Sequence, residues 1–284
     1  MTDRPMRSAL YLPASNLRAI EKARTLACDV VILDLEDAVG PDAKLIARDQ
    51  LAGALGGGFA APTVVIRVNG LDTEWGPADL DAAVAARPDA ILAPKIDSGA
   101  ALLPYEARIG KDSGIALWAM VETARAVFRL DDIASAAERG LLSCLVLGTN
   151  DLAKESGAQP GVDRLPFQAI FGLAVMAARA SGIAILDGVF NALDDAEGLA
   201  AQCRQAVEFG FDGKTLIHPR QIDICTSAFT PEPAAVEAAR RIIAAFDEPE
   251  NAGKGAIRLD GKMVERLHLV EARRTLAKAG VAAV

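Results

Sequence analysis

Short apolar runs recur along most of the chain, and segments with helical spacing separate them. The runs are rich in Val, Ile and Leu and are mostly continuous, which is typical of strands buried on both faces. They predict strands at Ser8–Leu12, Val30–Leu33, Thr63–Val68, Ala90–Ala93, Ile115–Val121, Leu142–Leu147, Ile183–Leu186 and Gly213–Ile217. Apolar residues three or four positions apart predict helices at Asn16–Ala27, Asp42–Leu55, Pro77–Ala86, Ser98–Ile109, Thr123–Ala137, Leu165–Ala180 and Asp194–Phe209.

The regular alternation of strand and helix predicts a parallel sheet with right-handed crossovers. Eight such units in about 230 residues favour an α/β fold of the closed (β/α)8 type, a TIM barrel. An open, doubly wound sheet is the alternative. Pro13-Ala14-Ser15 follows the first strand where a dinucleotide-binding sheet carries a glycine-rich turn, and this weakens the alternative.

The last part of the chain cannot join a closed barrel of eight strands. A helix is predicted at Glu232–Phe246, then a polar linker at Asp247–Gly255 and a final helix at Lys262–Lys278. We therefore divide the chain into a barrel domain, residues 1–246, and a linker with a C-terminal helical lid or arm, residues 247–284. Several apolar residues of the arm need a covering surface, either a neighbouring subunit or the chain's own barrel: Val264, Leu267, Leu269, Val270 and Leu276.

Composition narrows the classes of partner. The chain has 284 residues, 51% of them hydrophobic, which is ample for a large core, and its net charge of −8 argues against a nucleic-acid surface. No apolar run approaches the roughly 20 residues that a membrane span requires, and Met1–Arg7 lacks the apolar segment of a secretory signal. The expected location is the cytoplasm. Reduced, buried thiols are expected at Cys28, Cys144, Cys203 and Cys225.

Two acidic residues stand at the ends of neighbouring apolar runs. Ile115–Val121 runs directly into Glu122, and Leu142–Leu147 leads through a short Gly-Thr-Asn segment into Asp151. Adjacent parallel strands place such ends about 5 Å apart. Two carboxylates at that separation repel each other unless they share a proton or a cation. Because only oxygen ligands are at hand, the pair predicts a hard ion, Mg²⁺.

Other polar residues fall at the same ends of the predicted strands, where barrel enzymes carry their active sites. Arg67 has two readings, as an ion-pair partner of the acidic segment Asp34–Asp37 or as a fork for a substrate carboxylate. Lys95 could equally cap the sheet or act in a site, and Asp187 could equally be a turn residue before Gly188 or act in a site. His218 precedes a proline, and we interpret it as structural.

Seven short motifs, in this order, resemble those of the citrate lyase β-subunit-like branch of the HpcH/HpaI aldolase family. They cover nearly the whole chain: RSALYLP from Arg7, LDLEDAV from Leu33, VIRVNG ending at Gly70, APKI from Ala93, VET from Val121, LGTNDLA from Leu147 and IHPRQI from Ile217.

The resemblance implies roles for particular residues. Glu122 and Asp151 would bind Mg²⁺, and Arg67 would contact the carboxylate of an oxo-acid. Arg7 would lie on the side of the pocket that receives coenzyme A, with Lys95 a weaker candidate there. The two acidic residues that would position Arg67 and a metal-bound water are Glu36 and Asp37.

A second resemblance concerns the arm. The segment Asp260-Gly261-Lys262-Met263-Val264 looks like the lid of stand-alone acyl-CoA lyases of this branch. It implies that Asp260 reaches a neighbouring subunit's site and handles the α-proton of the acyl-CoA. It also implies a homo-oligomer, a trimer or hexamer, that works independently of a citrate lyase complex.

The function expected from these features is a Mg²⁺-dependent lyase. It would cleave a 3-hydroxyacyl-CoA, such as malyl-CoA or citramalyl-CoA, into an acyl-CoA and an oxo-acid. Three alternatives stay open: hydrolysis of the same CoA thioesters, a carrier-dependent subunit of citrate lyase, and a plain binding protein on a barrel scaffold.

Overall fold

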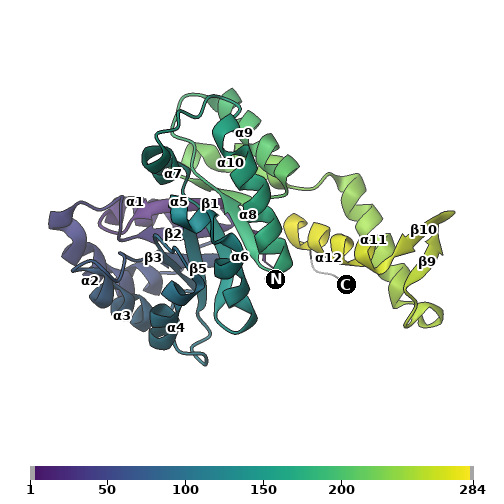
Figure 1. Ribbon diagram of the computed structural model, residues 1–284, viewed down its shortest axis with the longest axis horizontal. Helices are drawn as coiled ribbons and strands as arrows, with labels where there is room; N and C mark the ends of the chain where they lie inside the picture. The colour runs from purple at the N-terminus through teal and green to yellow at the C-terminus, as the bar shows by residue number, and fades with distance from the viewer. Residues whose placement is uncertain (1–3, 282–284) are drawn as a thin grey trace. The chain divides into compact units, whose positions relative to one another are not determined.

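The strands form a closed parallel barrel in chain order, as predicted. The computed structural model describes residues 4–281. Figure 1 shows the strands enclosed by helices. The barrel strands are β1 (Ser8–Pro13), β2 (Val30–Asp34), β3 (Thr63–Arg67), β4 (Ala90–Ala93), β5 (Ala116–Val121), β6 (Leu142–Leu147), β7 (Ala184–Asp187) and β8 (Gly213–Leu216). The ring closes because β8 pairs with β1.

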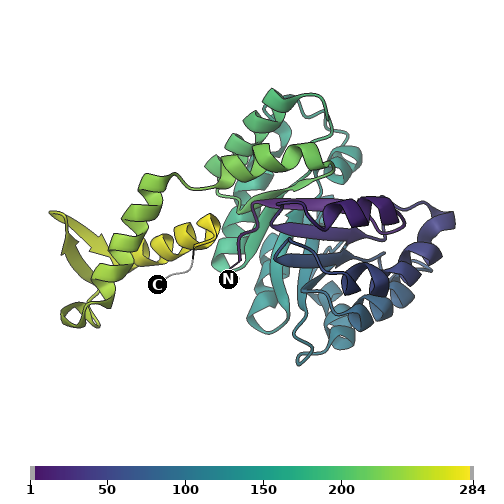
Figure 2. The ribbon, with the colours of Figure 1, turned by 180° about the vertical axis from the view of Figure 1, so that it is seen from behind.

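Helices follow the strands around the outside, and α1 lies beside the first strand in the view from behind (Figure 2). They are α1 (Leu17–Ala23), α2 (Lys44–Gly56), α3 (Gly76–Ala86), α4 (Leu103–Ile109), α5 (Ala124–Val127), α6 (Leu130–Ser135), α7 (Thr149–Ser156), α8 (Gln168–Ala180), α9 (Ala196–Phe209) and α10 (Ile222–Phe229). The long helix predicted at Thr123–Ala137 is in fact two short helices, α5 and α6, separated at Phe128 and Arg129.

The barrel interior is filled by side chains that point inward from alternate strand positions. The inner cluster includes Trp118 and Met120 of β5, Tyr11 of β1 and Leu186 of β7, all nearly inaccessible to solvent. Residues between these positions point outward and are covered by the helices, so both faces of most strands are apolar and buried. This double burial is why the strands read as continuous hydrophobic runs.

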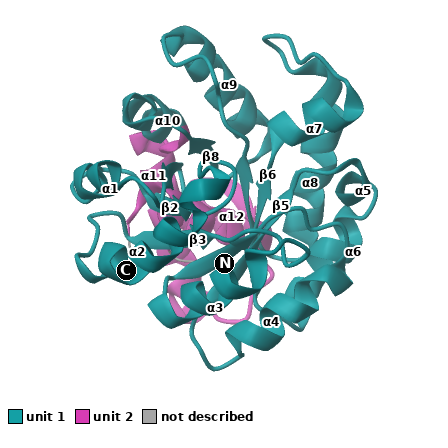
Figure 3. Cartoon of the chain, turned by 90° about the vertical axis from the view of Figure 1, so that its left-hand side faces the viewer, with its two compact units in different colours: residues 1, 6–228 teal, residues 2–5, 229–284 magenta. Residues whose placement is uncertain are grey.

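The structure divides the chain at a different point from the predicted boundary after residue 246. The second compact unit begins at Phe229 (Figure 3). Helix α11 (Pro233–Asp247) belongs to this unit because it packs against α12 (Arg266–Ala279). Between these helices lies a two-stranded antiparallel sheet of β9 (Ala256–Leu259) and β10 (Lys262–Glu265).

The prediction of a helix from Lys262 was wrong for its first turn. Lys262–Glu265 is a strand, and the helix begins at Arg266. The reason is the two-residue turn Asp260-Gly261, in which both residues have positive φ, 51° and 79°. That is the backbone of a type I′ hairpin turn, for which Asp-Gly is a preferred sequence.

The apolar side of the arm is covered within its own unit. Val264, Leu269 and Leu276 are buried against Ile243 and Phe246 of α11. The two exposed members of the predicted set are Leu267 and Val270. Neither covering surface considered from the sequence, a neighbouring subunit or the barrel, is needed for the buried residues, because α11 supplies it.

Candidate active site

A pocket opens at the carboxyl ends of the barrel strands, with a volume of about 260 Å³. It brings together four of the residues singled out from the sequence, which come from four different strands or the loops that follow them: Asp37, Arg67, Glu122 and Asp151. Sequence analysis missed other lining residues, among them Tyr11, Thr149 and Asn191. The expectation that these strand ends meet at one site is therefore met for these four.

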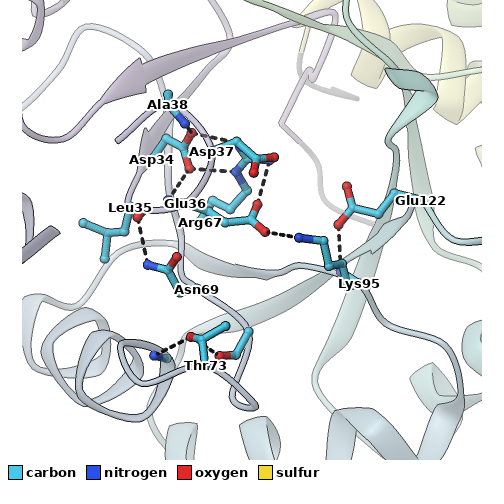
Figure 4. Close-up of polar contacts among 12 residues, drawn as sticks. Asp34, Leu35, Glu36, Asp37, Ala38, Arg67, Asn69, Thr73, Lys95 and Glu122 are labelled. Atoms are coloured by element: carbon cyan, nitrogen blue, oxygen red, sulfur yellow. Dashed lines mark hydrogen bonds and ion pairs between the residues drawn. The ribbon is translucent and has the colours of Figure 1, made fainter. Parts of the chain in front are cut away.

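Arg67 is held by three carboxylates from the end of β2 (Figure 4). Its Nε and Nη2 donate to the two oxygens of Asp34 at 2.7 and 2.6 Å, a bidentate fork. Its Nη1 lies 3.1 Å from Glu36 and 3.5 Å from Asp37. The guanidinium also lies over the ring of Tyr11, 4.7 Å from its centroid. Both readings of Arg67 from the sequence must share one guanidinium, and the ion pairs occupy most of it.

The charges around Arg67 perturb each other's protonation. Burial alone would lower the pKa of Arg67, but the carboxylates around it, chiefly Asp34, raise it well above its usual value. Burial raises the pKa of Glu36, and Arg67 opposes that rise only in part. Glu36 also receives an ion pair from the Lys95 ammonium at 3.1 Å. Glu36 therefore links the arginine to the lysine across the mouth of the barrel.

Glu122 is buried at the end of β5 with one oxygen occupied and the other free. Oε1 accepts a hydrogen bond of 2.7 Å from the backbone N–H of Lys95, whose φ of 51° is left-handed. Oε2 has no hydrogen-bond partner among residues 4–281. Burial, followed by repulsion from Glu36, raises the pKa of Glu122 to about 8, and Asp151 adds to this repulsion. A buried carboxylate oxygen with no donor beside it is a place for a proton or a cation.

The other carboxylate of the predicted metal pair belongs to the first turn of a helix that the sequence did not predict. Helix α7 begins at Thr149, directly after β6 and Gly148, and Asp151 is its third residue. The Gly148 N–H donates to the carbonyl of Val121, which ties the start of α7 to the end of β5. This link places the Asp151 side chain in the same pocket as Glu122.

These residues fit a magnesium ion, although they do not form a complete cage. Within the described part of the chain, no three or more Asp, Glu, His or Cys side chains cluster as metal ligands. Magnesium is commonly bound by one or two carboxylates, with water and substrate completing its octahedron. The unpartnered oxygen of Glu122, a hard donor with a raised pKa, and the carboxylate of Asp151 meet that requirement.

A second pocket of about 410 Å³ lies beside the first and shares Asp37 with it. Glu36, Lys95 and Lys44 also line it. The Lys44 ammonium is almost fully buried, and it donates to the carbonyls of Leu35 and Glu36 and to the side chain of Asn69. These bonds fix the backbone that presents Glu36 and Asp37. The sequence gave no sign of this, because Lys44 stands in an ordinary amphipathic helix.

Arg7 does not line this pocket, and its role on the coenzyme A side stays a prediction. It precedes β1, so it lies at the amino ends of the strands, opposite the pocket. Its Nε and Nη2 donate to the two oxygens of Asp29, each at 2.8 Å. Asp29 in turn precedes β2, so the pair joins the starts of two adjacent strands.

Asp187 closes the sheet between β7 and β8 as part of a buried ion cluster. Arg164 Nη1 donates to both of its oxygens, at 2.8 and 2.9 Å, and Lys214 Nζ donates to one at 2.7 Å. Burial alone would raise the pKa of Asp187, but the two cations lower it below its usual value. His218 caps the turn after β8 by accepting a hydrogen bond from the N–H of Arg220, which fits its structural reading.

The tail residue Asp260 belongs to the second unit. It stands in the β9–β10 turn, is exposed, and its carboxylate lies 3.1 Å from Nη1 of Arg241 on α11.

The four cysteines are buried and free, as predicted. No helix in residues 4–281 has both the length and the apolar composition needed to cross a bilayer.

Carboxylates, an arginine and a lysine gather at the carboxyl ends of the barrel strands, which is where barrel enzymes carry their active sites. The chain belongs to the HpcH/HpaI aldolase/citrate lyase family, whose model matches residues 7–219. It is 50% identical over 276 residues to a (3S)-malyl-CoA thioesterase of Cereibacter sphaeroides, which covers 97% of this chain and 95% of the relative. It is 30% identical over 290 residues to the citrate lyase subunit beta of Escherichia coli K12, covering 99% and 95%.

Solved structures give the same family. The protein CitE from Mycobacterium tuberculosis, in complex with magnesium, acetoacetate and coenzyme A, is 30% identical, with a TM-score of 0.72 over 98% of this chain and all of that one. RipC from Yersinia pestis is 30% identical, with a TM-score of 0.70 over 81% of this chain and 98% of that one. Magnesium is thus present in a solved structure of the family.

Proposed function

We propose that this protein is a Mg²⁺-dependent enzyme that hydrolyses the thioester of a 3-hydroxyacyl-CoA such as malyl-CoA. The observation that carries this proposal is the 50% identity, over nearly the full length of both chains, to a protein named (3S)-malyl-CoA thioesterase. The pocket supports it, because its carboxylates and cations suit a substrate that bears a carboxylate and a hydroxyl on neighbouring atoms. We therefore prefer hydrolysis to the lyase reaction that was expected from the sequence.

In this proposal Glu122 and Asp151 hold the magnesium ion. When bound, the ion supplies a Lewis acid and a template for the substrate's oxygens. The buried oxygen of Glu122 that has no donor would face the ion, while its other oxygen keeps the bond from the Lys95 N–H. That bond fixes the carboxylate's orientation before the substrate arrives.

Arg67 would bind the substrate's carboxylate with the N–H groups that its ion pairs leave over. Asp34 holds the guanidinium in one orientation through two hydrogen bonds, and the ring of Tyr11 supports its face. Arg67 cannot offer its Nε–Nη2 edge to a ligand without releasing Asp34. Because Glu36 and Asp37 already lie close to Nη1, it would act through the second N–H of Nη2, and this limits it to a single contact.

Glu36 and Asp37 would orient the attacking water. Burial raises the pKa of Glu36 toward the range of a useful general base, and its carboxylate lies between Arg67 and Lys95. Asp37 lines both pockets and is more exposed, so water reaches it freely. In the reaction, water adds to the thioester carbon, its proton passes to the base, and the carbon–sulfur bond breaks to give malate and coenzyme A.

Cleavage between carbon atoms is the second candidate, favoured by the citrate lyase β-subunit relatives at about 30% identity. Here the C2–C3 bond of malyl-CoA breaks, the hydroxyl proton is lost, and C2 gains a proton, which gives glyoxylate and acetyl-CoA. Asp260 is the proposed proton donor to C2, in its own subunit or in a second one. A homo-oligomer, a trimer or hexamer, belongs to this proposal, and light scattering of the purified protein would measure its mass.

An end-product assay separates the two reactions. The protein is incubated with malyl-CoA and MgCl2, and malate, glyoxylate, acetyl-CoA and free thiol are measured together by chromatography. We expect malate and free coenzyme A in equal amounts, abolished by EDTA. Glyoxylate and acetyl-CoA in equal amounts would replace hydrolysis by the lyase reaction. No turnover of malyl-CoA or citramalyl-CoA by the magnesium-loaded protein would refute both.

A further inference from the structure

The chain has two tyrosines, and one of them lies at the floor of the candidate active site. Tyr11 points inward from β1 as part of the upper barrel core, and it lines the pocket together with Arg67 and Glu122. The other tyrosine, Tyr105 of α4, is buried outside this pocket, and its hydroxyl accepts a hydrogen bond from the N–H of Leu71.

The hydroxyl of Tyr11 lacks a strong partner. Among the described residues, the acceptor it reaches is the thioether sulfur of Met120, at 3.5 Å. A thioether is a weak acceptor, and buried tyrosine hydroxyls usually find a better one. Burial raises the pKa of this phenol; Arg67 opposes that rise, but the nearby carboxylates add to it, so the O–H stays a donor at any working pH.

The neighbouring arginine cannot recognise a carboxylate alone. Asp34 occupies the Nε and Nη2 edge of Arg67, and Glu36 and Asp37 lie close to Nη1. Three carboxylates around one guanidinium leave the region short of donors for another anion. The Tyr11 ring lies directly beneath this guanidinium, so its hydroxyl belongs to the same corner of the pocket.

We propose that Tyr11 is a substrate-contacting residue whose hydroxyl donates a hydrogen bond to the carboxylate of the bound hydroxy- or oxo-acid, beside the single contact of Arg67. This inference rests on the proposed function, because it assigns a role within that site. It explains why a buried donor faces a sulfur atom: the bond to Met120 is weak and is readily exchanged for one to a carboxylate.

Pyruvate in the presence of MgCl2 is the probe, and calorimetry measures its affinity. Tyr11→Phe keeps the ring beneath Arg67 and removes only the hydroxyl. We expect pyruvate to bind about 10- to 100-fold more weakly, the usual effect of losing a hydrogen bond to a charged group. Tyr105→Phe is the matched control, since it removes a buried tyrosine hydroxyl outside the pocket, and it should bind pyruvate as the unchanged protein does.

Fluorine NMR provides a second measurement that does not depend on a variant at position 11. Protein labelled with 3-fluorotyrosine carries two signals, and Tyr105→Phe assigns them. Pyruvate should shift the Tyr11 signal and leave that of Tyr105 in place. A Tyr11→Phe protein that is folded and binds pyruvate within about twofold of the unchanged protein would overturn the inference.

The remaining outcomes are also decisive. A Tyr11 signal that does not move at saturating pyruvate overturns the inference, and so does the absence of any pyruvate binding. If pyruvate binding depends on Tyr11 while malyl-CoA and citramalyl-CoA are not turned over, the proposed function fails and the role of Tyr11 stands. If malyl-CoA is turned over and Tyr11→Phe leaves kcat and KM unchanged, the proposed function stands and the role of Tyr11 is overturned.

Discussion

Gly148 and Glu122 fit against each other at the ends of adjacent strands, without room for another atom. A Cβ atom built on Gly148 would lie 2.4 Å from the Cβ of Glu122 and 2.6 Å from its Oε2. Both contacts are far inside van der Waals distance. The glycine therefore creates the space in which the unpartnered carboxylate oxygen sits, one residue before the helix that carries Asp151.

Gly148→Ala should therefore weaken magnesium binding. The added methyl group must displace the Glu122 carboxylate, which the proposal makes a metal ligand. Changing a residue that positions a metal ligand typically costs about 10- to 100-fold in metal affinity, and we expect a loss of that size here. Calorimetric titration with MgCl2 measures it.

Gly172→Ala is the control for Gly148→Ala, because nothing lies within 4 Å of a Cβ at that helical position. It should bind magnesium normally and be slightly more stable, since alanine favours a helix. Equal magnesium affinities for the two variants would contradict the fit described here.

Magnesium binding should depend on pH through Glu122. Because burial raises the pKa of Glu122 to about 8, the metal-free carboxyl holds a proton at neutral pH, and a cation must displace it. The apparent affinity should rise with pH up to about 8 and level off above it. Titrations in buffers of different ionisation enthalpy would count the proton released.

The same group gives the metal-free protein an opposite dependence of stability on pH. The folded carboxyl keeps its proton between the usual pKa of 4.5 and about 8, whereas the unfolded one has lost it. The free energy of unfolding should therefore fall as pH rises across this window and be flat on either side. Glu122→Gln should remove this decline, and urea titrations in EDTA would show whether it does.

Arg67 should be essential for stability as well as for binding. Arg67→Met leaves the fully buried carboxylate of Asp34 without its cation, and breaking such a pair costs about 3–5 kcal/mol. Urea unfolding of the single variant measures this cost. Adding Asp34→Asn should recover a substantial part of it, because the buried charge is then gone. Additive losses in the double variant would mean that the pair contributes little.

The barrel and the convergence of Glu122 and Asp151 on one pocket could be predicted from the sequence, because both follow from strand order. Continuous apolar runs marked the strands, and polar residues directly after them had to meet at one end of the barrel. Glu122 and Arg67 were identified in this way, and the structure brings them into one pocket. Arg7 was assigned by resemblance instead, although its position before β1 places it at the other end.

Contacts made by residues on helices and in loops could not be predicted from the sequence. Lys44 and Arg164 look like ordinary charged residues in the sequence, and their burial depends on which carbonyls and carboxylates the fold brings to them. The arm shows a different failure. Asp260-Gly261 between alternating residues is a hairpin signal, but the helical spacing that follows it extended the predicted helix backward to Lys262.

Asp260→Asn distinguishes the two proposed reactions by whether a proton is moved at C2. Direct hydrolysis of the thioester forms no carbanion at C2, so the variant should hydrolyse malyl-CoA at close to the normal rate. Cleavage of the carbon–carbon bond requires a proton donor there, and losing it should slow the reaction by about 10²- to 10⁴-fold without weakening magnesium binding. Arg241→Gln is the companion variant, because it removes the ion-pair partner of Asp260 but keeps the carboxylate.

Exchange of the C2 protons of acetyl-CoA in D2O, followed by NMR, reports the same proton transfer in isolation. Exchange that persists in Asp260→Asn would remove Asp260 from the reaction, whereas exchange that is lost, in a protein that still hydrolyses malyl-CoA, would mean that one barrel carries out both reactions with separate groups.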